Sequence, residues 1–237
     1  MSAALREQLV AIRDHYHTKN HKFFDLWANG RLNKRQMGYY LIQHGRMTRD
    51  GLRAYGLCWV KAPPDVQKHI MANLAEETGE KALTDESAAV DHRMLLGAWT
   101  TACGYSDAEV AAVESVPAAE AIRHHWMHAA HQYPWPVFLA TMTVLESQEV
   151  GIQSRIVPAL VQFYGYKFGD PEIRFFEEHY EADQIHAERN LQFFDRVDDP
   201  ELQASCIEHA TGICKLRWHY MNEIYRHAVM GEPDDLP

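Results

Sequence analysis

Residues 176–190 read FEEHYEADQIHAERN and contain the pattern H-x-x-x-D-x-x-H, formed by His179, Asp183 and His186. An α-helix turns by roughly 100° per residue, so these three side chains lie within an arc of roughly 60°. Two imidazoles and a carboxylate on one helix face supply half of a metal site. The alternative is a solvated polar helix face, because several glutamates surround the pattern.

Helical periodicity continues on both sides of this stretch, and no segment alternates apolar and polar residues as a strand does. Asparagine, serine, proline and glycine mark the expected helix ends. We predict an all-α fold in a single domain spanning residues 1–237, with a frayed tail from about residue 231. The expected helices cover residues 2–17, 21–30, 33–59, 64–79, 92–104, a short segment from 106, 117–133, 134–165 and 200–230.

Composition excludes several classes of protein. The chain has 237 residues, a formal net charge of −10 and 46% hydrophobic residues. An acidic chain without a basic cluster is a poor nucleic-acid binder, since binding phosphates needs an excess of Lys and Arg. No apolar run is long enough for a signal peptide or a membrane-spanning helix, and the four cysteines are scattered. We therefore expect a cytoplasmic protein with no nucleic-acid or membrane partner.

Glu146 interrupts a strongly apolar helix, with VFLATMTVL before it and VGI shortly after. A buried carboxylate is costly unless it is neutral, paired or bound to a metal, which makes Glu146 a candidate functional residue. Glu149, one turn later, is expected at a helix edge. His44, Arg46 and Arg49 are expected at the surface of the long helix 33–59, as are the scattered histidines 15, 17, 21, 69 and 209.

Glu77 and His92 complete a set of candidate ligands. Together with Glu146, His179, Asp183 and His186 they give three carboxylates and three imidazoles on different helices, and helical bundles use such mixed sets to hold two iron or manganese ions. The set contains no cysteine, which argues against a structural zinc site. A competing cluster, His124, His128 and His131 with His125 adjacent, has the same helical spacing, and we expect it to line a helix surface or the mouth of a pocket.

With these motifs in place, the sequence resembles the haem-oxygenase-like diiron oxidase and oxygenase family, whose relatives include the TenA, PqqC and CADD-like proteins. The resemblance rests on HKFFDLWANGRLNKRQMGYYLIQH at residues 21–44, NLAEETG at 73–79 leading to His92, the LE of VLESQE at 144–149, and the H-x-x-x-D-x-x-H pattern. It implies a bundle of about seven core helices, a dinuclear iron site and a homodimer. The implied iron ligands are Glu77, His92, Glu146, His179, Asp183 and His186. Glu76, Glu80 and Asp85 stay open as substitutes for Glu77, because the separation from Glu77 to His92 is longer than in many members.

The function that the resemblance implies is activation of dioxygen by two Fe(II) ions, or manganese in their place, to oxidise a small amino-acid-like or fatty-acid-like substrate. Tyr40, Met47 and Tyr55 could wall the pocket, with an arginine anchoring a substrate carboxylate, although core packing explains them better. One alternative is a metal-free enzyme on the same scaffold, either a cofactorless oxidase or a thiamin-type hydrolase. TenA-like hydrolases use a cysteine on the helix where Glu146 stands, and none of the four cysteines lies there. The third hypothesis is a helical binding module without enzymatic activity.

Overall fold

The computed structural model describes residues 4–80, 91–179 and 190–232, and the described residues contain helices but no strand. Residues 174–179 are helical as well, in addition to the named elements. The elements are α1 (Leu5–His15), η1 (Thr18–Asn20), α2 (Lys22–Ala28), α3 (Lys34–Thr48), α4 (Gly51–Lys61), α5 (Pro64–Glu77), α6 (His92–Ala102), α7 (Asp107–Ala112), α8 (Pro117–Gln132), α9 (Trp135–Tyr164), η2 (Phe193–Arg196), α11 (Pro200–Tyr225) and η3 (Arg226–Met230). The all-α prediction is confirmed.

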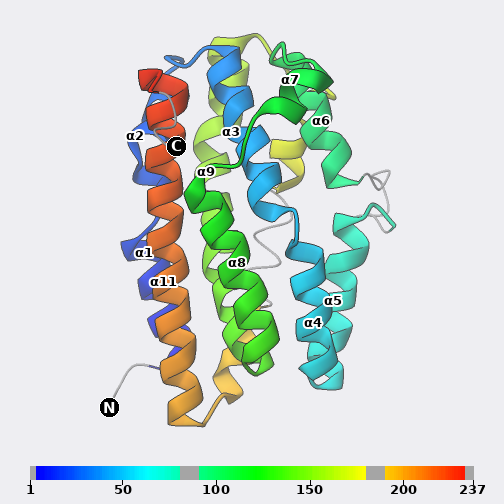
Figure 1. The fold of residues 1–237 in the computed structure, drawn as a ribbon, viewed down its shortest axis with the longest axis vertical. Coiled ribbons are helices and arrows are strands. Elements are labelled where there is room, and N and C mark those ends of the chain that lie inside the picture. Colours follow the sequence, from blue (N-terminus) through cyan, green and yellow to red (C-terminus); the bar gives the residue numbers. More distant parts are fainter. Residues whose placement is uncertain (1–3, 81–90, 180–189, 233–237) are drawn as a thin grey trace.

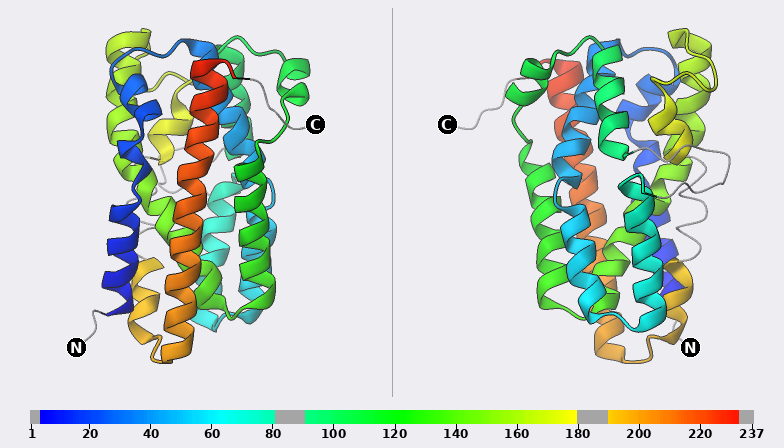
Figure 2. Two further views of the ribbon diagram at one scale, coloured as in Figure 1. Left: turned by 60° about the vertical axis from the view of Figure 1, so that its left-hand side comes forward. Right: turned by 90° about the vertical axis from the view of Figure 1, so that its right-hand side faces the viewer.

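The long helices run along one axis of an elongated bundle (Figure 1). Helix α9 packs against α11, α8, α4, α2 and α1, so most of the bundle is assembled around it. Helices α5 and α6 follow each other along one side, with the end of α5 near the start of α6 (Figure 2). This junction becomes important below, because it carries two of the candidate ligands.

Helix α9 has the length and apolarity that its sequence predicts. It begins after Pro134, runs for 30 residues through Pro158, and ends at Gly165, which has a left-handed φ of 80°. Its side chains are buried on nearly every face of its first two-thirds. A helix that is hydrophobic all round belongs at the centre of a protein, so any carboxylate on it needs a compensating partner.

The prediction of one continuous helix over residues 33–59 is wrong. The structure has two helices there, α3 and α4, separated at Arg49 and Asp50. The break lets the Asp50 carboxylate accept a hydrogen bond from Arg123 Nη1 of α8 at 2.6 Å, with both side chains largely buried. A charge-assisted pair of this kind is stronger than a neutral hydrogen bond. Gly51, a poor helix former, then starts α4.

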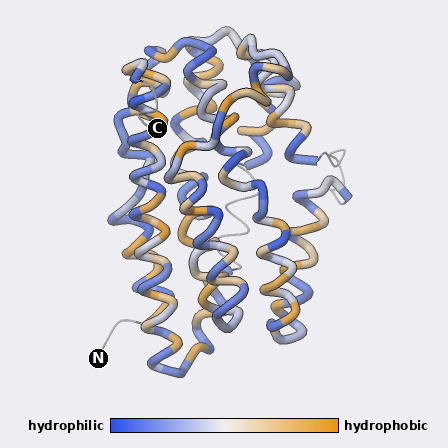
Figure 3. The backbone as a smooth tube through the Cα atoms, in the orientation of Figure 1, coloured by the Kyte–Doolittle hydropathy of each residue, from blue (hydrophilic) through white to orange (hydrophobic). Residues whose placement is uncertain are grey.

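The apolar faces of the helices meet in one continuous cluster of buried residues. Most of the outer helices carry both hydrophilic and hydrophobic residues along their length, as expected of helices with one buried face (Figure 3). No helix in the described ranges is long and apolar enough to span a bilayer. The single-domain and homodimer predictions stay predictions.

Candidate metal centre

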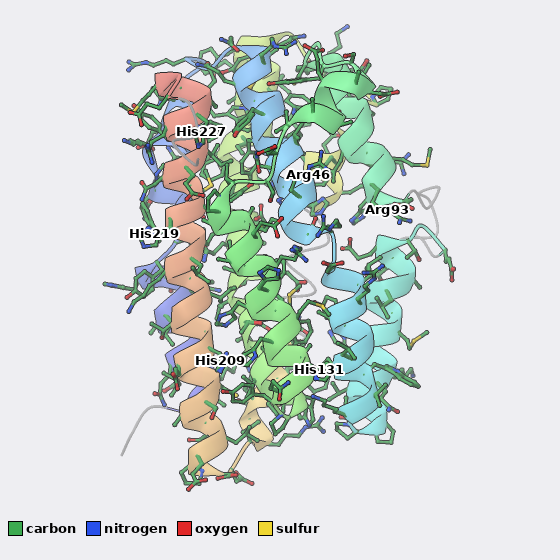
Figure 4. The ribbon with its side chains drawn as sticks, in the orientation of Figure 1. Arg46, Arg93, His131, His209, His219 and His227 are labelled. Atoms are coloured by element: carbon green, nitrogen blue, oxygen red, sulfur yellow. The ribbon has the colours of Figure 1, made fainter. Side chains whose placement is uncertain are left out.

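Three predicted ligands meet where α5 ends and α6 begins. Glu77 is the last residue of α5, His92 is the first of α6, and His179 lies in the helical segment 174–179. Each offers one ligand atom, and the three atoms lie within 4.8 Å of one another. In Figure 4 this junction is found beside Arg93, the residue after His92. Three side chains separated by up to about a hundred residues of sequence therefore converge at one point.

Local interactions fix the two helix ends. Helix α5 stops at Gly79, whose φ of 71° is left-handed and suits only glycine well. Helix α6 starts because the Asp91 side chain accepts a hydrogen bond from the backbone N–H of Arg93. The Arg93 guanidinium also pairs with Asp91, which holds the capping carboxylate in place. The ends of α5 and α6 thus present Glu77 and His92 towards each other.

His92 and Glu77 are close in a way that suits two ligands of one ion. Nδ1 of His92 lies 2.9 Å from Oε2 of Glu77, without the alignment of a hydrogen bond to any described residue. Two donor atoms about 2.1 Å from a divalent ion, at right angles, are about 3 Å apart. Burial lowers the pKa of His92, but the neighbouring Glu77 and then Glu178 outweigh it, so the pKa is raised. A cation in this position would take the place of that proton.

His179 is held in one orientation. Its Nδ1 is 2.6 Å from the carbonyl oxygen of Phe175, so Nδ1–H donates to this carbonyl and Nε2 keeps its lone pair. The imidazole packs on the Phe175 ring with a centroid distance of 4.1 Å, and its centroid is 4.7 Å from that of His92. Such a second hydrogen bond is the usual way in which a protein orients a histidine ligand.

Glu146 of α9 is hydrogen-bonded to Tyr55 of α4, and the charge of Glu77 also acts on Tyr55. The Tyr55 hydroxyl donates to Oε1 of Glu146 at 2.6 Å, and the Asn190 amide lies 3.4 Å from Oε2. Burial, then the Glu146 carboxylate, and further Glu77, raise the pKa of Tyr55 well above its ordinary value. Tyr55 is therefore hydrogen-bonded to Glu146 and is also influenced by the charge of Glu77. His69 contacts Asn190 at 2.6 Å and extends this network.

The remaining predicted ligands differ in where the structure places them. Asp183 and His186 lie outside the described residues, and so does Asp85, one of the possible substitutes for Glu77. Glu80 is exposed and Glu76 is partly buried. Among described residues, only Glu77, His92 and His179 form a converging group of three metal-ligating side chains. Metal ligation by the six residues stays a prediction.

Glu149 corrects an expectation, because it is buried rather than at a helix edge. Its Oε1 accepts from Arg217 Nη2 of α11 at 2.7 Å, and the two side chains are 12% and 3% exposed. Burial raises the pKa of Glu149, and Arg217 opposes this rise. The partner of this acid on the apolar helix α9 is therefore Arg217, which was not predicted from the sequence.

His44 corrects a second expectation, since its side chain enters the bundle instead of the solvent. Burial lowers its pKa well below the ordinary value, and Arg217, His179 and His92 lower it further. Arg46 is partly buried and donates to the carbonyl oxygens of Val110 and Val113, whereas Arg49 is exposed as expected. The sequence did contain a signal for the burial of His44, because His44 lies one helical turn after Tyr40, which is buried on α3.

The competing histidine cluster lines a helix surface, as predicted, except that His125 turns towards α11. His124, His128 and His131 are exposed on α8, while His125 Nε2 lies 3.2 Å from Nδ1 of His209 on α11. His209 and His131 can be found on these two helices in Figure 4. Burial lowers the pKa of His125 to about 4, helped by the neighbouring histidines. His209 is buried, as are His17 and His21, so the surface prediction was wrong for these three.

The donors at the junction suit iron. Carboxylate oxygens and imidazole nitrogens are ligands of non-haem iron, while the thiolates of structural zinc sites are absent from the described cluster. The buried His92 Nδ1, which lacks an aligned hydrogen-bond partner among described residues, fits a position that a cation fills. The residues present therefore fit the metal that the resemblance implies.

Comparison with known proteins identifies the family. Residues 38–218 match the family model described as "Iron-containing redox enzyme". The chain belongs to this family of iron-containing redox enzymes. Two curated relatives are both named 4-aminobenzoate synthase. One, from Nitrosomonas europaea, is 23% identical over 94% of this chain and 91% of its own length. The second, from Chlamydia muridarum, is 28% identical over 84% and 83%.

Solved structures place this iron-containing redox enzyme in the haem-oxygenase-like fold. A TenA homologue from Pseudomonas syringae has a TM-score of 0.77 at 13% identity and covers 93% of this chain and 92% of its own. A domain of unknown function with a haem-oxygenase-like fold from Shewanella denitrificans has a TM-score of 0.75 at 15% identity, covering 98% and 97%. The fold predicted from the resemblance is confirmed.

Proposed function

We propose that this iron-containing redox enzyme is a non-haem dinuclear iron oxidase or oxygenase, which uses dioxygen to oxidise a small organic substrate. The observation that carries the proposal is the convergence of Glu77, His92 and His179 within 4.8 Å, in a chain of an iron-containing family. Glu146 accepts a hydrogen bond from Tyr55, a residue on which the charge of Glu77 acts. Asp183 and His186 are included on the sequence alone, because the spacing H-x-x-x-D-x-x-H predicts one helical face for them and His179.

The donor count supports two ions. Three carboxylates, those of Glu77, Glu146 and Asp183, would neutralise most of the charge of two divalent cations, and three imidazoles complete the set. When bound, two ferrous ions supply the electrons for dioxygen reduction. Manganese accepts the same oxygen and nitrogen ligands and is the alternative metal.

The chain's own residues orient the ligands and exclude water. Phe175 holds the His179 ring by its carbonyl oxygen and its aromatic face. Tyr55 holds one oxygen of Glu146 in place. Aromatic rings of Trp27, Trp99 and Phe176 pack together in the adjoining core. These three rings are fully buried and keep water from their side of the cluster, whereas the Glu77 side chain is 38% exposed.

A cysteine-dependent hydrolase on the same scaffold is poorly supported. All four cysteines are buried, and burial raises the pKa of each thiol to about 12. The thiolate is the nucleophile, and a thiol with so high a pKa is inert at neutral pH. None of them lies on α9 beside Glu146.

The substrate class is broader than the relatives' name. The two relatives named 4-aminobenzoate synthase are only 23–28% identical to this chain, so their name alone does not fix its reaction, and iron is supported by the family model. We keep the substrate as a small amino-acid-like or fatty-acid-like molecule, and a reaction that yields 4-aminobenzoate is one member of this range. Dioxygen is the proposed co-substrate.

The test is metal content combined with oxygen consumption. Protein produced with iron should contain about two irons per chain by elemental analysis, as the six-ligand set requires. Glu146→Gln should lower both the iron content and the Fe(II)-dependent oxygen uptake, with helical circular dichroism near that of the wild type. His131→Ala, on the exposed face of α8, is the control and should change neither. Full iron content and oxygen uptake in Glu146→Gln would refute the proposal.

A further inference from the structure

A buried polar cluster lies on the inward face of α3. Tyr40, His44 and Met47 are spaced i, i+4 and i+7, so they share one helix face. Arg217 of α11 is 2% exposed and reaches both ends of this row. Its Nη2 lies 3.3 Å from the Tyr40 hydroxyl, and its Nη1 lies 3.5 Å from the Met47 sulfur. The guanidinium therefore contacts the residues before and after His44 on this helix face.

His44 lies between this guanidinium and the candidate metal centre. Its ring packs edge-on against Phe175 at 5.7 Å, and Phe175 in turn packs on His179. The His44 ring centroid also lies 6.2 Å from that of Tyr40, which contacts Arg217. Arg217, then His179 and His92, act electrostatically on His44. The Nδ1 atom of His44 is buried and has no hydrogen-bond partner in the part of the chain that the structure describes.

Arg217 also has unused hydrogen-bonding capacity. A guanidinium carries five N–H donors, and Nη2 is engaged by Tyr40 and Glu149. The contact of Nη1 is the Met47 thioether, which is a weak acceptor. Methionine is flexible and yields readily to a ligand. A carboxylate oxygen in its place would give a charge-assisted hydrogen bond, which is about twice as strong as a neutral one.

We propose that His44 and Arg217 bind the carboxylate of an acidic small-molecule substrate beside the metal centre. This inference rests on the proposed function, in which the substrate is an amino-acid-like or fatty-acid-like molecule, and it adds the two residues that bind the carboxylate and the resulting orientation of the substrate. The carboxylate would lie between α3 and α11, and the rest of the molecule would extend towards His92 and His179.

The simpler interpretation is that Arg217 and Glu149 form a structural ion pair that ties α11 to α9. That interpretation accounts for Nη2, which contacts Glu149. It gives no reason for the buried Nδ1 of His44 to lack a partner among described residues, a state that costs stability. An anionic ligand group between Nη1 and Nδ1 explains both.

Matched pairs of ligands test the charge requirement by titration calorimetry, with Fe(II)-loaded protein under anaerobic conditions and with metal-free protein. The pairs are 4-aminobenzoate with 4-aminobenzamide, and octanoate with octanamide. In at least one pair the carboxylate should bind about tenfold or more tightly than its amide, as a charge-assisted hydrogen bond implies. Equal binding within both pairs, or no binding at all, overturns the proposal.

Two variants locate the preference. His44→Phe keeps the Arg217–Glu149 pair and should reduce the carboxylate preference about tenfold, with thermal stability equal to or above that of the wild type. Glu149→Gln combined with Arg217→Gln replaces the ion pair by an amide pair and should abolish the preference without stranding a buried charge. His131→Phe is the control and should leave the preference unchanged. A preference that survives both variants, in folded protein, refutes the assignment.

The two proposals fail separately. Suppose that the protein lacks iron and takes up no oxygen, yet prefers carboxylates in a way that depends on His44 and Arg217. That result would refute the dinuclear-iron function and support the anion site. Protein that consumes oxygen but binds the amides equally well would do the reverse. Iron content of His44→Phe should equal that of the wild type, because His44 is not among the proposed ligands.

Discussion

Removing the Tyr55 hydroxyl should weaken metal binding while leaving the fold intact. In Tyr55→Phe the Glu146 carboxylate loses a buried hydrogen bond of 2.6 Å. Hydrogen bonds to charged groups contribute about 1.5–3 kcal/mol, and loss of a partner that orients a metal ligand lowers affinity about 10–100-fold. These two estimates agree, since about 1.4 kcal/mol corresponds to a tenfold change. We therefore expect Fe(II) affinity to fall by about 10–100-fold.

The assay is an anaerobic Fe(II) titration of the metal-free protein, followed by oxygen uptake at saturating iron. Tyr166→Phe is a matched control, because the Tyr166 hydroxyl is buried without a hydrogen-bond partner among the described residues. It should leave iron affinity unchanged and should be neutral or slightly stabilising in thermal unfolding. Equal iron affinity in wild-type and Tyr55→Phe protein would show that Tyr55 does not position a ligand, and the link from Glu146 to the cluster would then be lost.

Two further predictions concern the contact between α9 and the segment after α1. A Cβ at Gly151 would lie 2.6 Å from Nε2 of His17, so Gly151→Ala should cost about 1–3 kcal/mol in urea unfolding. Gly56→Ala, whose Cβ would meet nothing within 4 Å, should instead be neutral or stabilise by up to about 1 kcal/mol, and equal effects of both would contradict this packing. His17 itself predicts acid sensitivity, because burial, then Lys19 and Arg13, lower its pKa from 6.5 to about 4. Above pH 6.5 this group has no effect, and as the pH falls from 6.5 towards 4 the unfolded chain takes up a proton that the folded protein refuses. At pH 5 the loss should be about 2 kcal/mol, and a stability profile of His17→Asn parallel to that of the wild type between these values would disprove it.

The sequence predicts the helices well because their boundaries are local. Asn33 and Ser106 both act as the N-caps that their residue types indicate, each with a reciprocal capping residue three positions later. The division between α3 and α4 could not be seen locally, since Asp50 finds its partner Arg123 on α8. The same limit applies to Tyr55, whose role depends on a contact with Glu146 across 91 residues of sequence.

Glu146 and Glu149 show most clearly where reasoning from sequence stops. Both residues lie on α9, the most apolar helix, and are separated by one turn. The cost of burying a carboxylate implies that each must have a compensating partner. That cost does not say whether the partner is a metal, a cation or a hydrogen-bond donor. Glu149 pairs with the guanidinium of Arg217, whereas the Glu146 carboxylate accepts a hydrogen bond from the hydroxyl of Tyr55. The two acids are three residues apart and therefore lie only about 60° from each other around the helix axis, so the angle between them does not decide their partners. The neighbouring helices do, because α4 supplies Tyr55 to Glu146 and α11 supplies Arg217 to Glu149. A buried acid in an apolar helix therefore predicts that compensation exists, and only the packing of the surrounding helices determines its kind.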